Sequence, residues 1–274
     1  MRAPLSGHIS TAGRTHRTEG VRDIHRALPE EVPVALVFNG TTQAVMMATP
    51  ADLSDFAHGF ALTEGIVNDL AQIEDFEIIH HEQGLEARFW LSEDRADMLI
   101  ARRRAMAGPV GCGLCGIDSL EQAVRPVPRV ETDLRLDPGD VARATDALRP
   151  HQHLHDLTHA THAAGFLSPG GGLSLAREDV GRHNALDKLI GALLQQGIAP
   201  ASGAAVMTSR LSVELVQKCA MAGIPVLIAV SAPTGAAVHL AQQAGITLAA
   251  FARSGGFDLY SHPHRITDEA EHVA

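Results

Sequence analysis

A regular alternation of apolar runs and amphipathic segments beyond residue 200 constrains the fold more than any other feature of the chain. Three short apolar runs are separated by two segments whose apolar residues recur at helical spacing; the runs span 204–208, 224–230 and 246–252, and the segments span 212–221 and 234–244. Such alternation is typical of strands joined by right-handed helical crossovers, with helices on the faces of the sheet. It predicts an α/β domain with a largely parallel sheet.

Further elements precede this alternation. Residues 163–167 and 173–180 flank a Pro-Gly-Gly-Gly turn and predict a hairpin, and residues 184–196 predict a helix. Another helix is expected to run from Val141 through Leu148 toward Leu157. Together these elements define a C-terminal domain over residues 137–274.

The first third of the chain predicts a smaller α+β domain. Residues 32–38 and 44–47 flank Asn39-Gly40, a pair that supports the positive φ angles of a tight hairpin turn. A helix is expected between Pro50 and Gly65, and a second hairpin is formed by residues 76–80 and 85–91. We assign residues 1–20 to a disordered tail, 21–107 to this N-terminal domain and 108–136 to a loop and linker.

The composition argues against several classes of protein. The 274-residue chain is 45% apolar, which is enough for a buried core, and its formal net charge of -10 disfavours nucleic acid or an anionic membrane as a partner. Three cysteines provide no disulfide framework and fit a reducing compartment. No apolar run suits a signal peptide or a membrane span, so the expected location is cytoplasmic.

Two of the three cysteines lie in a loop that presents thiols. Cys112 and Cys115 stand in the sequence Gly-Cys-Gly-Leu-Cys-Gly, and the glycines disfavour a helix or a strand. A structural zinc site needs four ligands, and the chain has no second C-x-x-C pair, although two chains could each contribute one pair to a shared site. A thioredoxin-type pair belongs at the start of a helix, where glycines stand here. An exposed, flexible pair suits a thiolate that accepts sulfur and passes it on, so sulfur transfer is favoured over zinc binding.

The remaining potential ligands carry less information. Cys219 lies on the apolar side of the helix predicted over 212–221 and is expected to be a buried, inert thiol. Five histidines between residues 151 and 162 have no cysteine or carboxylate partner at ligand spacing, so we expect no metal site there. The motifs of zinc nucleobase deaminases are not met, because His80-His81-Glu82 lies at a hairpin turn and two residues separate Pro109 from Cys112.

Polar residues follow the carboxyl ends of the predicted strands. They occupy residues 178–183, 208–210, 231–234 and 253–256, and they include Arg210, Thr234 and Arg253. In an open α/β sheet such loops share one crevice, where hydroxyls, helix N-termini and arginines predict a seat for a phosphorylated ligand. Each residue alone could be a helix cap or a solvated charge, but the agreement of four loops favours a binding site.

Several long motifs resemble one family. The segments Glu31–Val37, Phe60–Gly65, Gly111–Gly116, Thr161–Ala164, Glu178–Leu189 and Val213–Lys218 are similar to the FdhD family of formate dehydrogenase accessory sulfurtransferases, and the likeness extends from roughly Val21 to the C-terminus. The resemblance implies that the C-terminal domain has a three-layer, cytidine-deaminase-like α/β fold without the deaminase zinc site.

The resemblance also implies a function. It implies a cytoplasmic homodimer that takes sulfur from a cysteine desulfurase as a persulfide and passes it to Mo-bis(molybdopterin guanine dinucleotide) before that cofactor enters formate dehydrogenase. Cys112 matches the persulfide carrier and Cys115 its partner in the pair. The segment assigned to the guanine dinucleotide, which GDP and GMP mimic, matches Phe251, Ala252, Arg253, Ser254, Gly255 and Gly256, of which the last is often basic in relatives. A cofactor-binding chaperone without sulfur chemistry and a zinc-binding protein are the alternatives.

Overall fold

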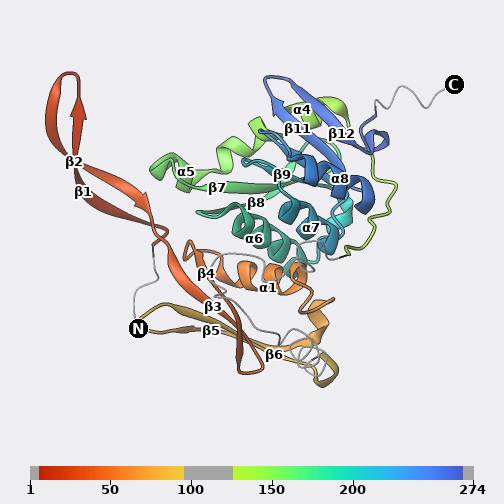
Figure 1. Cartoon of the computed structure of the whole chain (residues 1–274), viewed down its shortest axis with the longest axis horizontal. Coiled ribbons are helices and arrows are strands. Elements are labelled where there is room, and N and C mark those ends of the chain that lie inside the picture. Colours follow the sequence, from red (N-terminus) through yellow and green to blue (C-terminus); the bar gives the residue numbers. More distant parts are fainter. Residues whose placement is uncertain (1–5, 96–125, 268–274) are drawn as a thin grey trace.

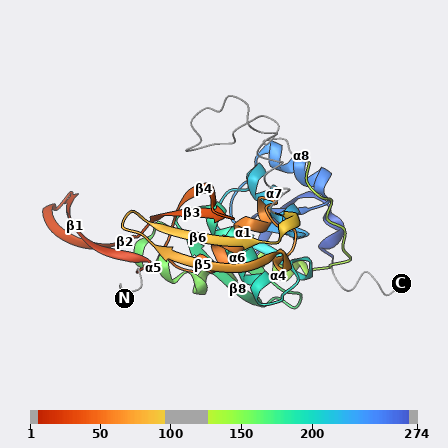
Figure 2. The same cartoon turned by 90° about the horizontal axis from the view of Figure 1, so that it is seen from below.

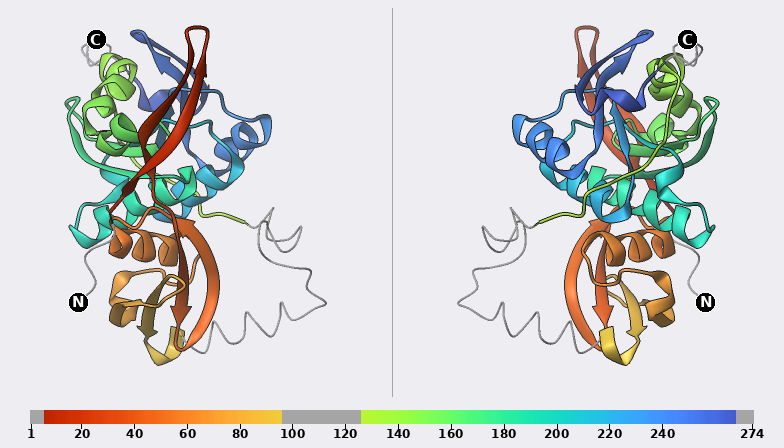
Figure 3. Two further views of the ribbon diagram at one scale, coloured as in Figure 1. Left: turned by 90° about the vertical axis from the view of Figure 1, so that its left-hand side faces the viewer. Right: turned by 90° about the vertical axis from the view of Figure 1, so that its right-hand side faces the viewer.

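The computed structural model describes residues 6–95 and 126–267. In this part of the chain, a small N-terminal sheet lies beside a larger α/β body, and a long two-stranded hairpin projects from their junction (Figure 1). The view from below shows the four strands of the N-terminal sheet in front of the body (Figure 2). Helix α1 (Leu53–Thr63) lies between that sheet and the body, as the side views show (Figure 3).

The N-terminal sheet has the strand order β4-β3-β6-β5. Strand β3 (Val32–Phe38) pairs antiparallel with β4 (Thr41–Ala48) and parallel with β6 (Leu85–Leu91), and β6 pairs antiparallel with β5 (Ile73–His80). Both predicted hairpins are confirmed. Asn39 and Gly40 have φ angles of 46° and 73°, as the tight turn requires.

The core of this domain lies between the sheet and α1. Phe38 stacks on Phe89 with ring centroids 4.8 Å apart, and Phe56 of α1 is fully buried beside them. The short helix η1 (Leu70–Gln72) precedes β5 and is capped by Asp69. Helix α1 thus covers the sheet with one face and leaves another for the body.

The sheet of the body has the order β12-β11-β10-β9-β7-β8. Its strands are β7 (His162–Leu167), β8 (Leu173–Asp179), β9 (Ala204–Met207), β10 (Val226–Ala229), β11 (Thr247–Arg253) and β12 (Gly256–Ser261). Alternate residues of β9 face opposite sides: Ala205 and Met207 pack with α6 (Arg182–Gln195), α7 (Val213–Ala222) and α8 (Gly235–Ala244), whereas Ala204 and Val206 pack with α4 (Pro138–Leu148). The body therefore has three layers.

The largely parallel sheet expected from the sequence is a mixed sheet. Strand β10 is parallel to β9 and β11, but β7 is antiparallel to β8 and β9, and β11 is antiparallel to β12. The helical crossovers set only the parallel pairs. The other pairs arise because hairpins extend the sheet at both ends, and β12 was not predicted.

The expectation of a disordered tail over residues 1–20 is wrong for the part that the structure describes. Residues His8–Arg17 form β1 and pair along their whole length with β2 (Gly20–Pro29). The pattern was missed because these strands are mostly polar and carry no apolar alternation, while their pairing depends on backbone hydrogen bonds. The boundary that we drew at residue 21 divides this hairpin.

The helix expected to continue from Val141 toward Leu157 is also wrong. Helix α4 ends at Leu148, a 3-10 turn follows over Arg149–His151 (η2), and a separate short helix α5 covers His153–Thr158. Pro150 explains the break, because it has no N–H for the helical ladder and its ring clashes with the preceding turn. Helix α4 begins at Pro138, before the Val141 expected from the apolar pattern, and Asp137 caps it by accepting hydrogen bonds from the N–H groups of Gly139 and Asp140.

The last part of the predicted linker packs on the body. Val130 is buried, and its N–H donates to the Ala244 carbonyl at 2.8 Å. Leu136 bridges to Ile266, close to the end of the described chain, where the short helix η4 covers Pro263–Arg265. Residues 200–202 form a further 3-10 turn, η3 (Pro200–Ser202).

Candidate functional site

Loops from neighbouring strands meet at one edge of the body sheet. The carboxyl ends of β8, β9 and β10 lie there, because β7 runs antiparallel to both β8 and β9. Backbone N–H groups tie the loops together: Leu211 donates to Ala232 at 3.1 Å, Thr234 to Leu211 at 2.9 Å, and Phe251 to Ser231 at 3.3 Å. The segments that contain Arg210, Thr234 and Phe251 are therefore adjacent.

The segment 251–256 forms the turn of the hairpin between β11 and β12. Arg253 pairs with Gly256, and Ser254 and Gly255 occupy the turn with φ angles of 54° and 77°. All four residues are exposed, as are Arg210 and Thr234. The predicted cofactor segment therefore presents its donors at the surface.

One residue of this segment anchors it to the body. Ala252 is buried, and its carbonyl accepts a hydrogen bond from the Thr145 hydroxyl of α4. Gly256, in contrast, has no atom within 4 Å of where a Cβ would stand. A larger side chain would fit at this position, and the backbone there does not require glycine.

Three buried polar atoms at the starts of two helices have no hydrogen-bond partner among the described residues. They are Arg182 Nε, His183 Nε2 and Ser212 Oγ. Arg182 and His183 begin α6, and Ser212 is the residue before α7. His183 Nε2 lies 3.9 Å from a carboxylate oxygen of Glu214. Because an unpaired buried polar atom costs stability, this cluster is a candidate contact for the polar groups of a ligand.

The charge state of His183 follows from its surroundings. Burial, together with the positive charges of Arg182 and Lys218, lowers the pKa of His183 to about 4. The imidazole is therefore neutral at pH 7 and offers one donor and one acceptor. Burial and the nearby Arg182 also lower the pKa of His162, which starts β7.

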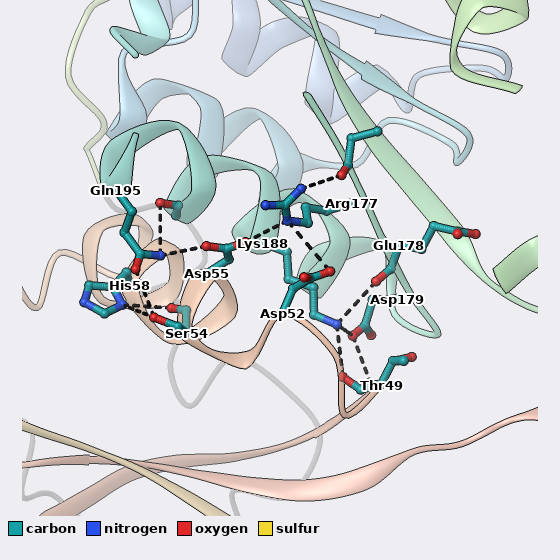
Figure 4. Close-up of polar contacts among 12 residues, drawn as sticks. Thr49, Asp52, Ser54, Asp55, His58, Arg177, Glu178, Asp179, Lys188 and Gln195 are labelled. Atoms are coloured by element: carbon teal, nitrogen blue, oxygen red, sulfur yellow. Dashed lines mark hydrogen bonds and ion pairs between the residues drawn. The ribbon is translucent and has the colours of Figure 1, made fainter. Parts of the chain in front are cut away.

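Contacts across the domain interface hold this edge in place. The Asp179 carboxylate accepts a hydrogen bond from the Thr49 N–H at 3.0 Å and pairs with Lys188 Nζ at 2.7 Å, and both charged side chains are fully buried (Figure 4). Asn184, in the first turn of α6, donates to the Met47 carbonyl at 2.8 Å. The N-terminal domain thus fixes the start of α6, from which Arg182 and His183 project.

A second buried ion cluster joins α1, α6 and α7. Lys218 Nζ lies 2.9 Å from Asp187, 3.0 Å from Glu64 and 3.0 Å from the Thr63 hydroxyl. Sequence reasoning missed both clusters. Their signal was present, because Asp187, Lys188 and Lys218 interrupt the apolar faces of predicted helices.

The proposed sulfur carriers, Cys112 and Cys115, lie outside the described residues. The third cysteine, Cys219, is fully buried in α7 among apolar side chains, as expected. Burial raises the pKa of its thiol, so it is protonated at neutral pH.

Replacing Cys219 with alanine is expected to lower stability by about 1 kcal/mol and to leave function intact, because a small core contact is lost. Urea unfolding measures the first effect, and formate dehydrogenase activity in a strain carrying the variant measures the second. Rapid modification of Cys219 by a polar thiol reagent in the folded protein would contradict the assignment.

Within the described ranges, no group of three or more His, Cys, Asp or Glu side chains is placed to hold a metal ion. No helix in the same ranges is both long and apolar enough to cross a membrane.

The fold and this edge define an α/β protein whose smaller domain packs against the larger one beside the candidate site. Residues 29–267 match the FdhD/NarQ family, and the chain belongs to that family. It is similar in sequence to two curated relatives named sulfur carrier protein FdhD. The identity is 52% with the Agrobacterium fabrum protein, covering 88% of this chain and 89% of the relative, and 53% with the Bordetella bronchiseptica protein, covering 86% of each.

A solved structure gives independent support for the fold. The chain resembles the crystal structure of a protein from Desulfotalea psychrophila described as a formate dehydrogenase accessory protein. The TM-score is 0.76 at 26% sequence identity, and the match covers 96% of this chain and all of the other.

Proposed function

We propose that this protein is a sulfur carrier that serves formate dehydrogenase. The observation that carries the proposal is the match to relatives named sulfur carrier proteins, at more than 50% identity over most of the chain. The likeness to a structure described as an accessory protein of formate dehydrogenase supports formate dehydrogenase as the enzyme that it serves.

The chemistry resides in the cysteine pair. A thiolate on Cys112 attacks the outer sulfur of a cysteine desulfurase persulfide, forms a Cys112 persulfide and releases the desulfurase thiol. Cys115 is either an alternate carrier of the persulfide or the resolving thiol. As the resolving thiol, its thiolate attacks Cys112 Sγ, and the terminal sulfur leaves as sulfide and passes to molybdenum in Mo-bis(molybdopterin guanine dinucleotide), which is the substrate of the transfer. The pair is left as a disulfide, which a cellular dithiol reduces.

The edge of the body sheet is the proposed seat of the cofactor. Its exposed turn at 253–256 and the nearby Arg210 and Thr234 offer charged and hydroxyl donors to phosphate groups. The unpartnered atoms of Arg182, His183 and Ser212 offer further donors. These observations also fit a cofactor-binding chaperone without sulfur chemistry, so binding alone does not distinguish the two functions.

Intact mass distinguishes them. After incubation with a cysteine desulfurase and cysteine, the sulfur carrier gains the mass of one or two sulfur atoms, and a reducing agent removes them. A chaperone without sulfur chemistry gains none, and a zinc protein instead retains stoichiometric metal that is lost when the cysteines are replaced.

Replacing Arg253 with alanine is expected to weaken GDP binding about tenfold, because a charge-assisted contact to phosphate is lost. Titration calorimetry with the full chain measures the affinity. Arg14→Ala removes an exposed arginine of the projecting hairpin and is the matched control. Unaltered GDP affinity in Arg253→Ala would show that the nucleotide binds elsewhere.

The remaining parts of the proposal follow from the family resemblance. The protein acts in the cytoplasm as a homodimer and contacts a desulfurase and formate dehydrogenase in turn.

A further inference from the structure

The hairpin of β1 and β2, residues 8–29, is a long arm that extends away from the rest of the molecule (Figures 1 and 3). Its strands pair in continuous register from His8 opposite Pro29 to Arg17 opposite Gly20. Helix α5 packs near its base. Because a two-stranded hairpin is at best marginally stable in water, an arm of this length calls for a partner surface.

The register gives the arm two different faces. Directly opposed residues share a face, so Ile9 with Leu28, Thr11 with Arg26, Gly13 with Ile24, Thr15 with Arg22 and Arg17 with Gly20 lie together. We call this side the basic face. It has an apolar base, where Ile9 and Leu28 are 47% and 41% exposed, and a run of three arginines toward the tip. It carries no carboxylate.

The other face is neutralised internally. Arg14 pairs with Asp23 at 3.0 Å, and both side chains are exposed. Only the basic face therefore presents cationic groups without an acidic partner on the same face of the arm.

The charge of the whole chain indicates the kind of partner. The arm contains four arginines and two carboxylates, a formal charge of +2, so the rest of the chain carries -12. Nucleic acid or an anionic membrane would be repelled by this remainder. An acidic protein surface fits, and a second copy of this chain supplies one.

Strand β5 offers the matching surface. It is the edge strand of the N-terminal sheet, and Glu74 and Asp75 are exposed along it, whereas the exposed Glu77 pairs with Arg88 of β6 at 3.3 Å. An edge strand also has unpaired backbone groups that can accept another strand. The side views show the arm extending away from this sheet, so an arm does not cover the β5 edge of its own chain (Figure 3).

We propose that the basic face of the arm docks on the acidic β5 edge of a second copy of this chain. Two such contacts related by a twofold axis form a reciprocal dimer. The inference specifies the surface of the homodimer proposed above and rests on no part of the sulfur chemistry, so the two can fail separately.

Sedimentation velocity of the full chain tests the contact through its charges. Arg22→Glu is expected to weaken dimerisation about tenfold or more, because it places like charges together, and high salt is expected to weaken the unmodified dimer. Arg14→Glu makes the same change of charge on the other face and is the control, with an expected effect of less than threefold. A dimer equally sensitive to both variants, or a chain that stays monomeric, would overturn the proposal.

A mixing experiment identifies the acidic side. Glu74→Arg combined with Asp75→Arg is also expected to reduce self-association. In a heterodimer of this variant with Arg22→Glu, both arm contacts join unlike charges, one as in the unmodified chain and one with the signs reversed, so heterodimers form that neither variant forms alone. Circular dichroism confirms that each variant is folded. The absence of heterodimers from folded variants would place the docking surface elsewhere.

Discussion

Cys112→Ala is expected to abolish sulfur loading or the onward transfer of that sulfur, while leaving the fold intact. In the proposed mechanism the Cys112 thiolate is the group that attacks the desulfurase persulfide, and alanine has no nucleophile. The sequence predicts a glycine-rich loop around Cys112, and a thiol in such a loop would contribute little buried surface, so stability should not change. Intact mass after incubation with desulfurase and cysteine measures the loading, and formate dehydrogenase activity in a strain with only this variant measures the outcome.

The other cysteines provide the controls. Cys219→Ala retains the loop and should load normally, because its thiol is buried and protonated. Cys115→Ala distinguishes the two roles of Cys115. If Cys115 is an alternate carrier, the variant still loads sulfur on Cys112 and remains active. If Cys115 is the resolving thiol, the variant loads sulfur on Cys112 but cannot release it as sulfide. Normal formate dehydrogenase activity in the Cys112→Ala strain would contradict the mechanism.

The fold was predictable where sequence pattern and local geometry agree. The alternation beyond residue 200 located β9, α7, β10, α8 and β11, because each buries an apolar face against its neighbours. Asn39-Gly40 located the first hairpin, because few other pairs tolerate two positive φ angles. The hairpin of β1 and β2 was missed because most of its side chains are exposed. Strand β12 was missed for the same reason, since it is an edge strand of the body sheet with few buried side chains.

The candidate site was predictable only as a set of loops. The carboxyl ends of parallel strands lie at one edge of a sheet, so the segments of Arg210, Thr234 and Phe251 were predicted to be adjacent. The backbone hydrogen bonds between these segments confirm that they are adjacent. The unpartnered state of Arg182 and His183 depends on which atoms surround them in three dimensions. The spacing of residues in the sequence does not reveal which buried polar atoms lack a hydrogen-bond partner. The same holds for the buried pair of Lys188 and Asp179.

Gly59→Ala is expected to destabilise the protein by about 3 kcal/mol, because it forces apart the two helices that join the domains. A Cβ on Gly59 of α1 would stand 1.8 Å from the Asp187 carbonyl oxygen of α6, and a Cβ on Gly191 of α6 would stand 1.9 Å from the Asp55 carbonyl oxygen of α1. Both obstacles are helix backbone. Neither can move without separating the helices.

The consequences of that separation and the controls make this prediction specific. Moving α1 from α6 weakens the Thr63 contact to Asp187 and the Lys218 cluster, so the loss exceeds the intrinsic gain of about 1 kcal/mol for alanine over glycine in a helix. Gly235→Ala makes the same substitution at the start of α8, where no atom lies within 4 Å of the added Cβ, and should be neutral or slightly stabilising.

Because one displacement of the helices relieves both clashes, Gly59→Ala combined with Gly191→Ala should lower stability by less than the sum of the two single substitutions. Urea unfolding of the four variants decides the matter: a Gly59→Ala protein as stable as Gly235→Ala would mean that the helices do not cross at these glycines.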